Sequence, residues 1–363
     1  MGKTIKVLLT FDYELTLGGA KDYNRGLFDP ASRLIDEATA LKAPIVLFTD
    51  ICSAIRFKDW DYDGFYVPFR NQIHRSIREG HDVQLHIHPH WMTSVFVKGS
   101  YIPSADFSLS NFANEKNGYT IESIIGLAFN ELLAMGREAD RSYECVAFRA
   151  GGYDVEPESA RILTALNKLG VKIDSSLIKE FYLEYKFSKV DYTNSPRPSK
   201  WFISEKGPLT KEVRSGLLEL PISSIPVSLV DVLIRRGRKI INSAKYKSRV
   251  YSNSGNGFLV TQGKQGLNAR IRKIVNPLML SLDKEYFECK DLMRIVEHNV
   301  KLYQDENDDL VLTAIGHPKS MGQYHVGLMK EFVLALRERF QNDVSFVTYR
   351  DIKRNVLNNV EAH

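Results

Sequence analysis

Three of the nine histidines in the chain fall within five residues, at His86, His88 and His90. They stand where a short apolar segment, residues 82–87, comes to its end. Imidazole is a common neutral ligand for zinc and related ions. A single histidine is usually structural, but a cluster at the end of a strand indicates a metal site. From the residues alone, His86 could be paired with either His88 or His90.

Two carboxylates alternate at the end of another apolar segment. Residues 10–14 read Thr-Phe-Asp-Tyr-Glu and overlap the strand-like run at residues 5–11. Positions i and i+2 of a strand share one face, so Asp12 and Glu14 can point into the same pocket. On this segment alone, a plain polar strand end is an equally good interpretation.

Two further strand ends carry polar groups. Residues 148–153 read Phe-Arg-Ala-Gly-Gly-Tyr, in which Arg149 could pair with a carboxylate and hold it ionised. The paired glycines allow a close backbone approach to a ligand. His317 follows the apolar run at residues 310–315 and could act as a general acid or base near neutral pH. Taken singly, the first is as well explained by a simple turn and the second by a structural histidine.

The segments around these four groups alternate between strands and helices, which predicts an α/β fold with parallel strands. The four groups all follow predicted strands, at the ends where α/β barrels and open α/β sheets place their active sites. The predicted strands are residues 5–11, 44–48, 82–87, 145–148, 171–173, 217–222, 310–315 and 344–347. The predicted helices include residues 121–133, 290–303 and 324–340, together with helical patterns around residues 34–41, 69–77 and 156–169.

Two long stretches, residues 91–118 and 181–275, break this alternation. Loops of this length tend to be functional, and we interpret both as insertions that cover the mouth of a single domain spanning residues 1–363. The second stretch holds a basic run between residues 235 and 249. A solvated face is the ordinary explanation of such a run. The alternative is a patch for an acidic glycan, a lipid-linked precursor or an anionic membrane surface, which would include peripheral membrane contact.

The composition is that of an ordinary globular protein, with 44% hydrophobic and 26% charged residues. The net charge of +5 favours an anionic partner only weakly, and the basic residues lack the interleaved aromatics of a nucleic-acid binder. None of the three cysteines stands in a C-x-x-C pair, which predicts reduced thiols. The start of the chain lacks signal-peptide features, and no stretch approaches the ~20 apolar residues of a membrane helix. We therefore expect a cytoplasmic protein.

In this order, the motifs resemble those of the polysaccharide deacetylases of carbohydrate esterase family 4, the NodB-like family. Residues 10–14 (TFDYE) are similar to the first motif of the family. Residues 80–90 (GHDVQLHIHPH) keep the glycine, first histidine, acid and ligand spacing of the second. Residues 148–153 (FRAGGY) and 312–318 (LTAIGHP) are similar to the third and the last. The resemblance covers most of the chain, from Thr10 to His317.

The resemblance implies a distorted, incomplete (β/α) barrel and a metal-dependent hydrolase. Its reaction would remove acetyl groups from an N-acetylated sugar or a cell-surface polysaccharide precursor. A divalent metal, with Zn²⁺ as the first choice, would be held by Glu14, His86 and His90. Asp12 would be the catalytic base, held by Arg149, and His317 the general acid. The implied substrate pocket contains His88, Trp91, Gly152, Tyr153, Asp174 and Leu220.

Two other functions are compatible with the sequence. One is a hydrolase of the same fold that acts on small non-sugar amides, such as cyclic ureides. The other is a non-catalytic carbohydrate-binding protein with a vestigial site. Acetate release from N-acetylglucosamine oligomers separates the first from a sugar deacetylase, and metal analysis tests the second.

Overall fold

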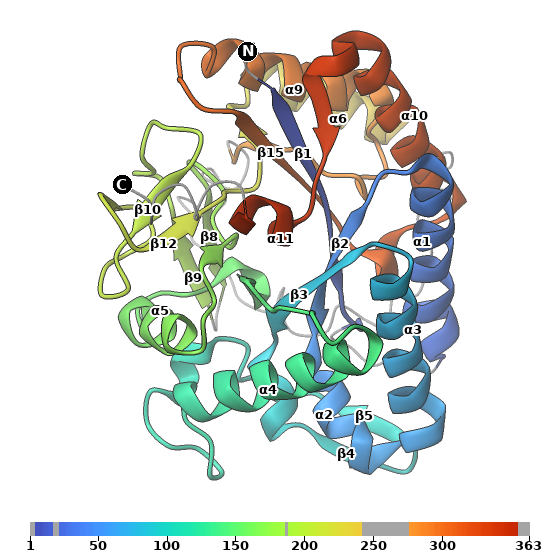
Figure 1. Ribbon diagram of the computed structural model, residues 1–363, viewed down its shortest axis with the longest axis vertical. Coiled ribbons are helices and arrows are strands. Elements are labelled where there is room, and N and C mark those ends of the chain that lie inside the picture. The colour runs from blue at the N-terminus through green and yellow to red at the C-terminus, as the bar shows by residue number, and fades with distance from the viewer. Residues whose placement is uncertain (1–3, 17–21, 186–187, 242–275, 355–363) are drawn as a thin grey trace.

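The computed structural model describes residues 4–16, 22–185, 188–241 and 276–354 (Figure 1). The strands are β1 (Ile5–Tyr13), β2 (Ile45–Asp50), β3 (Asp82–Ile87), β4 (Val95–Val97), β5 (Ser100–Ile102), β6 (Ala147–Ala150), β7 (Ile173–Asp174), β8 (Tyr182–Tyr185), β9 (Ser188–Asp191), β10 (Trp201–Ile203), β11 (Glu212–Val213), β12 (Leu217–Glu219), β13 (Ser224–Ile225), β14 (Leu278–Met279), β15 (Leu310–Gly316) and β16 (Val344–Phe346). The α-helices are α1 (Asp29–Leu41), α2 (Ile51–Trp60), α3 (Val67–Arg78), α4 (Ile121–Ala139), α5 (Ser159–Lys168), α6 (Leu229–Ile241), α9 (Cys289–Leu302), α10 (Gln323–Phe340) and α11 (Tyr349–Ile352). Short π- and 3₁₀-helical turns, among them η3 (Pro89–Thr93) and η5 (Gly151–Tyr153), follow several of the strands.

A curled sheet forms the centre of the molecule, with the strand order β11-β10-β12-β7-β6-β3-β2-β1-β15. The run from β12 to β15 is parallel, whereas β10 is antiparallel to both of its neighbours. β16 adds to β1 beside the start of that strand. Because β11 and β15 stand at opposite ends of this order and do not pair, the sheet stays open, and its curl makes it a half-barrel (Figure 1). The predicted distorted, incomplete (β/α) barrel is therefore confirmed.

The two faces of the sheet bury different side chains, as the two-residue period of a strand requires. On β1, Val7 and Leu9 pack with the surrounding helices in the main core, whereas Leu8 belongs to a second, smaller cluster. That smaller cluster also contains Tyr349 and Ile352 of α11. Figure 1 shows α11 in the hollow of the curled sheet, with α1, α3, α4 and α10 around the outside. The interior of the half-barrel is thus filled by side chains.

Most predicted elements are present, with their ends shifted by a few residues. The helix α2 was not predicted because it follows β2 without any intervening loop or turn signal. Within the predicted insertion at residues 181–275, β10, β11 and β12 join the main sheet. The basic run begins within α6. Lys245, Lys247 and Arg249 lie outside the described residues. The domain boundaries and the two insertions stay predictions.

The helices and the cysteines each bear on a prediction made from the sequence. In the described parts of the chain, none of the helices combines the length and the apolar character that crossing a membrane would need. The three cysteines, Cys52, Cys145 and Cys289, are all free thiols, as their spacing predicts.

Candidate metal centre and catalytic site

Parallel strands bring the predicted polar groups to one edge of the sheet. In the register of the sheet, His86 of β3 lies between Asp50 of β2 and Arg149 of β6. Asp12 stands near the end of the neighbouring β1, and His317 directly follows β15 on the far side of β1. Five side chains from the ends of neighbouring strands therefore meet in one place, although they are far apart in the chain.

Glu14, His86 and His88 form a compact group in which one possible ligand atom from each lies within 4.8 Å of the others. All three side chains are buried. Nδ1 of His86 donates a hydrogen bond to the backbone carbonyl of Arg149 (2.8 Å). This bond directs His86 Nε2 toward Glu14 Oε2, which is 3.6 Å away. A backbone acceptor that fixes the outer nitrogen is the usual support of a metal-binding histidine.

The two oxygens of Glu14 have different surroundings. Oε1 accepts a hydrogen bond from Lys319 Nζ (2.8 Å), and Oε2 contacts His88 Nε2. Burial works against the charged carboxylate, but the Lys319 and His88 charges outweigh it and hold the pKa of Glu14 well below its usual value. Glu14 is therefore an anion with one oxygen directed at the two histidines.

The donor atoms of this group fit a bound cation. Glu14 Oε2, His86 Nε2 and His88 Nε2 are buried and face one another, and no other group in the described part of the chain hydrogen-bonds to them. Buried polar atoms are rarely left in this way, because each loses its hydration without compensation. A divalent cation would satisfy all three atoms at once, which makes this group the metal site that the structure supports.

His90 lies beside this group without belonging to it. Its ring is fully buried and packs against Trp91 and Phe107, with ring centroids 4.9 and 5.0 Å away. Burial, together with the His88 charge, lowers the pKa of His90 well below its usual value, so the imidazole is neutral. Both of its ring nitrogens lack a hydrogen-bond partner. The role of His90 as a ligand stays a prediction, while the compact group contains His88 in its place.

Gly151 explains how His88 reaches the site. A Cβ atom at this position would lie 2.6 Å from both His88 Nδ1 and the carbonyl oxygen of Ile87. Only glycine therefore lets the turn after β6 pass so close to the histidine. Gly152 and Tyr153 come next with φ of +64° each, which turns the chain sharply at this point.

We expect the Gly151→Ala variant to bind metal about 10–100-fold more weakly, because the added methyl group displaces the His88 ring or its backbone. Competition with a chelator of known affinity measures the loss. The matched control is Gly126→Ala in α4, where an added Cβ meets nothing within 4 Å. Unchanged metal affinity in Gly151→Ala would contradict this role for the glycine.

Arg149 holds Asp12 as the family resemblance implies. The guanidinium is fully buried, and its Nη1 donates to Asp12 Oδ1 (2.7 Å) and Thr10 Oγ1 (2.9 Å). Its Nε donates to the Ser175 carbonyl (3.0 Å), and its face lies over the ring of Phe48. Burial raises the pKa of Asp12, but the Arg149, His86 and His317 charges overcome it and lower the pKa. Asp12 is consequently ionised.

His317, directly after β15, faces Asp12 of β1 and Glu14, which follows that strand. Its Nε2 lies 3.5 Å from Asp12 Oδ2 and 3.8 Å from Glu14 Oε1. Its Nδ1 is hydrogen-bonded to Asp283 Oδ2 at 2.7 Å. Burial lowers the pKa of His317, but the charges of Asp283, Asp12 and Glu14 outweigh it and raise the pKa. The side chain is still 21% exposed, so it can meet a ligand that arrives from solvent.

Three residues at this site were missed from the sequence: Asp50, Asp283 and Lys319. Asp50 ends β2 and accepts hydrogen bonds from the His88 backbone (3.3 Å) and from Trp91 Nε1 (2.6 Å). Burial raises its pKa to about 6. The sequence holds a signal for it, because an apolar strand ending in aspartate is also the pattern that indicates Asp12. Asp283 and Lys319 give no comparable signal.

The remaining residues predicted for the substrate pocket lie in different surroundings. Trp91 is fully buried against Tyr101. Tyr153 is partly buried, and burial together with the Asp12 charge raises the pKa of its hydroxyl well above the usual value. Asp174 and Leu220 are buried, with Leu220 packed in the smaller core cluster. The assignment of these residues to a substrate pocket stays a prediction.

Asp174 is paired with a second buried carboxyl group, Glu219. Burial is the main cause that raises both pKa values, and the charge and hydrogen bond of Asp174 raise the pKa of Glu219 further, to well above normal. Glu219 Oε1 also accepts a long hydrogen bond from the Leu177 N–H (3.4 Å). Burial beside the Asp174 carboxyl therefore favours the protonated, neutral form of Glu219.

The pKa of Glu219 is higher in the folded protein than in the unfolded chain. The stability that Glu219 contributes is therefore fully present below its unfolded-state pKa, and it is lost as the pH rises through its folded-state pKa. Glu219→Gln retains a neutral donor, so it should stabilise the protein at pH 8 by roughly 1 kcal/mol and flatten the dependence of Tm on alkaline pH. Thermal melts over a pH series measure this, with the exposed Glu212→Gln on β11 as the control. A lower Tm at pH 8 in Glu219→Gln would contradict the raised pKa of Glu219.

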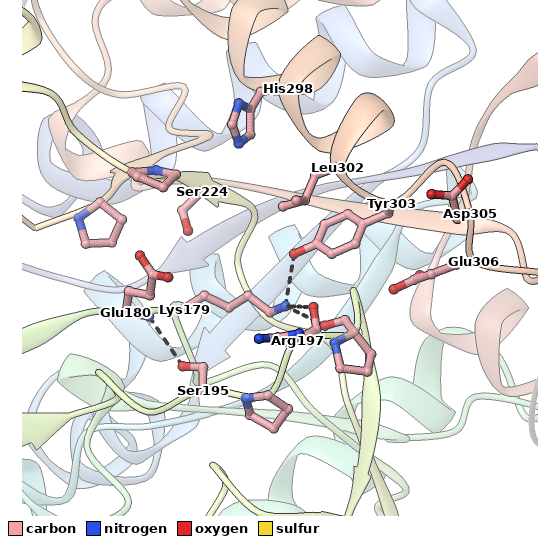
Figure 2. Close-up of a pocket in the computed structure, with 14 residues that line it drawn as sticks. Lys179, Glu180, Ser195, Arg197, Ser224, His298, Leu302, Tyr303, Asp305 and Glu306 are labelled. Atoms are coloured by element: carbon pink, nitrogen blue, oxygen red, sulfur yellow. Dashed lines mark hydrogen bonds between the residues drawn. The ribbon is translucent and has the colours of Figure 1, made fainter.

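A cavity of about 760 Å³ lies elsewhere, and none of the site residues lines it. Figure 2 shows Lys179 at its centre, donating to the Arg197 carbonyl (2.9 Å) and to Tyr303 Oη (2.9 Å). Lys179 Nζ also contacts the carbonyl of Pro198, and burial lowers the pKa of this amine to about 8. Three acceptors already surround the ammonium group, so it is not directed at a ligand. We therefore place the chemistry at the strand ends.

Comparison with known proteins yields fold likenesses only. No protein family model matches the chain, and no curated protein matches its sequence. A protein of Parabacteroides distasonis described as a glycoside hydrolase/deacetylase has a TM-score of 0.51 at 11% identity, over 96% of this chain and 70% of the other. A branching enzyme of Pyrococcus horikoshii has a TM-score of 0.50 at 11% identity, over 98% and 70%. A Mycobacterium smegmatis protein described as a polysaccharide deacetylase has a TM-score of 0.44 at 14% identity, over 99% and 92%. The expected resemblance to the deacetylases is confirmed at the level of the fold.

Proposed function

We propose that the protein is a metal-dependent hydrolase that removes acetyl groups from an N-acetylated sugar or a cell-surface polysaccharide precursor. One observation carries this proposal: the buried ligand atoms of Glu14, His86 and His88 converge beside an ionised Asp12 and a protonatable His317. Two imidazoles and one carboxylate are typical ligands of catalytic zinc sites, so we propose Zn²⁺. The deacetylase description of a fold neighbour agrees with this class of reaction.

Bound to these three residues, a divalent cation would polarise the acetyl carbonyl and acidify a coordinated water. Asp12 is placed to take the proton from the attacking water. Its Oδ1 is occupied by Arg149, so Oδ2 is the oxygen that accepts the proton. Arg149 is itself fixed by the Ser175 carbonyl, which keeps Asp12 in one orientation.

His317 is placed to donate the second proton. Asp283 holds its Nδ1, so Nε2 faces the site and can protonate the leaving amine, which departs poorly without that proton. The raised pKa of His317 keeps this proton available near neutral pH. The backbone N–H of Gly152 or Tyr153, in the turn beside His88, would meet the charge that develops on the carbonyl oxygen.

The test is acetate release from N-acetylglucosamine oligomers by the purified protein, before and after treatment with a chelator. We expect release that is lost with the metal and restored by added Zn²⁺. Hydrolysis of a cyclic ureide without any acetate release would favour the small-amide alternative. A protein that takes up no metal at all would contradict the proposal and favour a non-catalytic carbohydrate binder.

A further inference from the structure

The helix α6 is attached to the rest of the molecule through charged side chains. Asp231 lies 2.7 Å from Arg294, and Arg238 lies 2.9 Å from Asp291, with both partners on α9. Arg238 also donates a long hydrogen bond to the Tyr286 carbonyl (3.5 Å). A surface helix usually turns its apolar side inward and its charges outward. In α6, by contrast, charged side chains make the inward contacts with α9.

The apolar side chains of α6 are correspondingly exposed. Val230, Leu233, Ile234 and Ile240 are 62%, 67%, 49% and 79% exposed. Their spacing places them within roughly 120° around an ideal helix, on a side separate from Asp231 and Arg238. We call these four residues the α6 apolar face. Of the eleven large hydrophobic residues exposed in the described part of the chain, four lie on this one helix, so the exposure is concentrated.

Charge indicates what kind of partner would cover this face. The helix contains four basic residues, Arg235, Arg236, Arg238 and Lys239, against the single acidic Asp231, a net charge of +3. The next stretch of sequence, residues 242–275, adds seven lysines and arginines and no acidic residue. Two possible occupants of this face are a second copy of α6, which would bring a net charge of +3 against +3, and residues 242–275, which are also basic. Both would be opposed by like charge, whereas an anionic surface would be attracted.

We propose that the α6 apolar face inserts into the interfacial layer of an anionic lipid bilayer. An exposed apolar stripe on a basic helix is the pattern of helices that lie in the plane of a membrane surface. Apolar side chains enter between the headgroups, while lysine and arginine meet the anionic lipids. This inference is independent of the proposed hydrolase function, and neither fails with the other.

Sedimentation with vesicles tests the proposal on the full-length protein. We expect binding to phosphatidylcholine vesicles that contain phosphatidylglycerol, weaker binding as salt is added, and little binding to phosphatidylcholine alone. The double variant Leu233→Asp/Ile234→Asp should reduce partition into the mixed vesicles by about tenfold or more. The matched control, Leu127→Asp/Leu334→Asp, changes residues of similar exposure (46% and 49%) on α4 and α10 and should bind as the wild type does.

Three results would overturn the proposal. The first is no binding of the wild type to either kind of vesicle. The second is an equal loss of binding in the control variant. The third is a fall in Tm, or the dissociation of a dimer, in the α6 variant alone, which would show that protein covers this face. The acetate-release assay on the same preparations reports separately on the hydrolase.

Discussion

We expect the Asp12→Asn variant to retain its metal and to lose about 10²–10⁴-fold in kcat/KM, the usual contribution of a general base. The amide keeps an oxygen for Arg149 Nη1, so the orientation of the side chain is preserved. It cannot accept a proton at the position of Oδ2, which faces His317. The change therefore removes the proton acceptor and leaves Glu14, His86 and His88 in place.

Acetate-release kinetics and metal analysis on the same preparation measure this prediction. The substitution also leaves the buried Arg149 without its counterion, which lowers stability, so rates should be compared well below the Tm of the variant. The control is Asp36→Asn, an exposed aspartate paired with Arg75 far from the strand ends. Full activity in Asp12→Asn would show that Asp12 is not the base. Loss of the metal together with the activity would show that Asp12 is a metal ligand.

The place of the site could be predicted because it depends on strand ends. Each motif is a polar group after an apolar run, and parallel strands bring such ends to one edge of the sheet. Asp50 obeys the same rule and was missed because the predicted strand, residues 44–48, stops two residues short of the end of β2. The half-barrel itself is predicted by the alternation of elements together with the family resemblance.

The choice between His88 and His90 could not be predicted from spacing. Both lie beyond β3, where the extended backbone gives way to a 3₁₀ turn that begins at Pro89. Once the two-residue period of the strand is lost, sequence distance no longer gives the direction of a side chain. The turn directs His90 toward Trp91 and Phe107, whereas His88 stays beside Glu14.

Asp283 and Lys319 could not be predicted for a different reason. Asp283 precedes α9 in an irregular segment, and its link to the site is the hydrogen bond to His317, 34 positions later. Lys319 reaches Glu14 across 305 positions. Neither residue belongs to a periodic element or to a recognisable motif. Only the assembled fold shows that Asp283 orients His317 and that Lys319 places a positive charge beside Glu14.

His88→Ala is expected to lower metal affinity by at least about tenfold, because the variant removes one of three protein donors and leaves Glu14 Oε2 and His86 Nε2 with no third partner. Acetate release should fall with metal occupancy and recover in part at high metal concentration. Titration with Zn²⁺ against a competing chelator gives the affinity, and Asp12→Asn provides an inactive reference with an intact group.

His90→Ala is the matched variant, since it removes an equally buried imidazole only two residues away. Because His90 packs against two aromatic rings outside the compact group, we expect its loss to reduce stability by a few kcal/mol through the cavity that it leaves, with a smaller effect on metal affinity than His88→Ala. The reverse order of the two metal affinities would establish the His86–His90 spacing that the family resemblance implies.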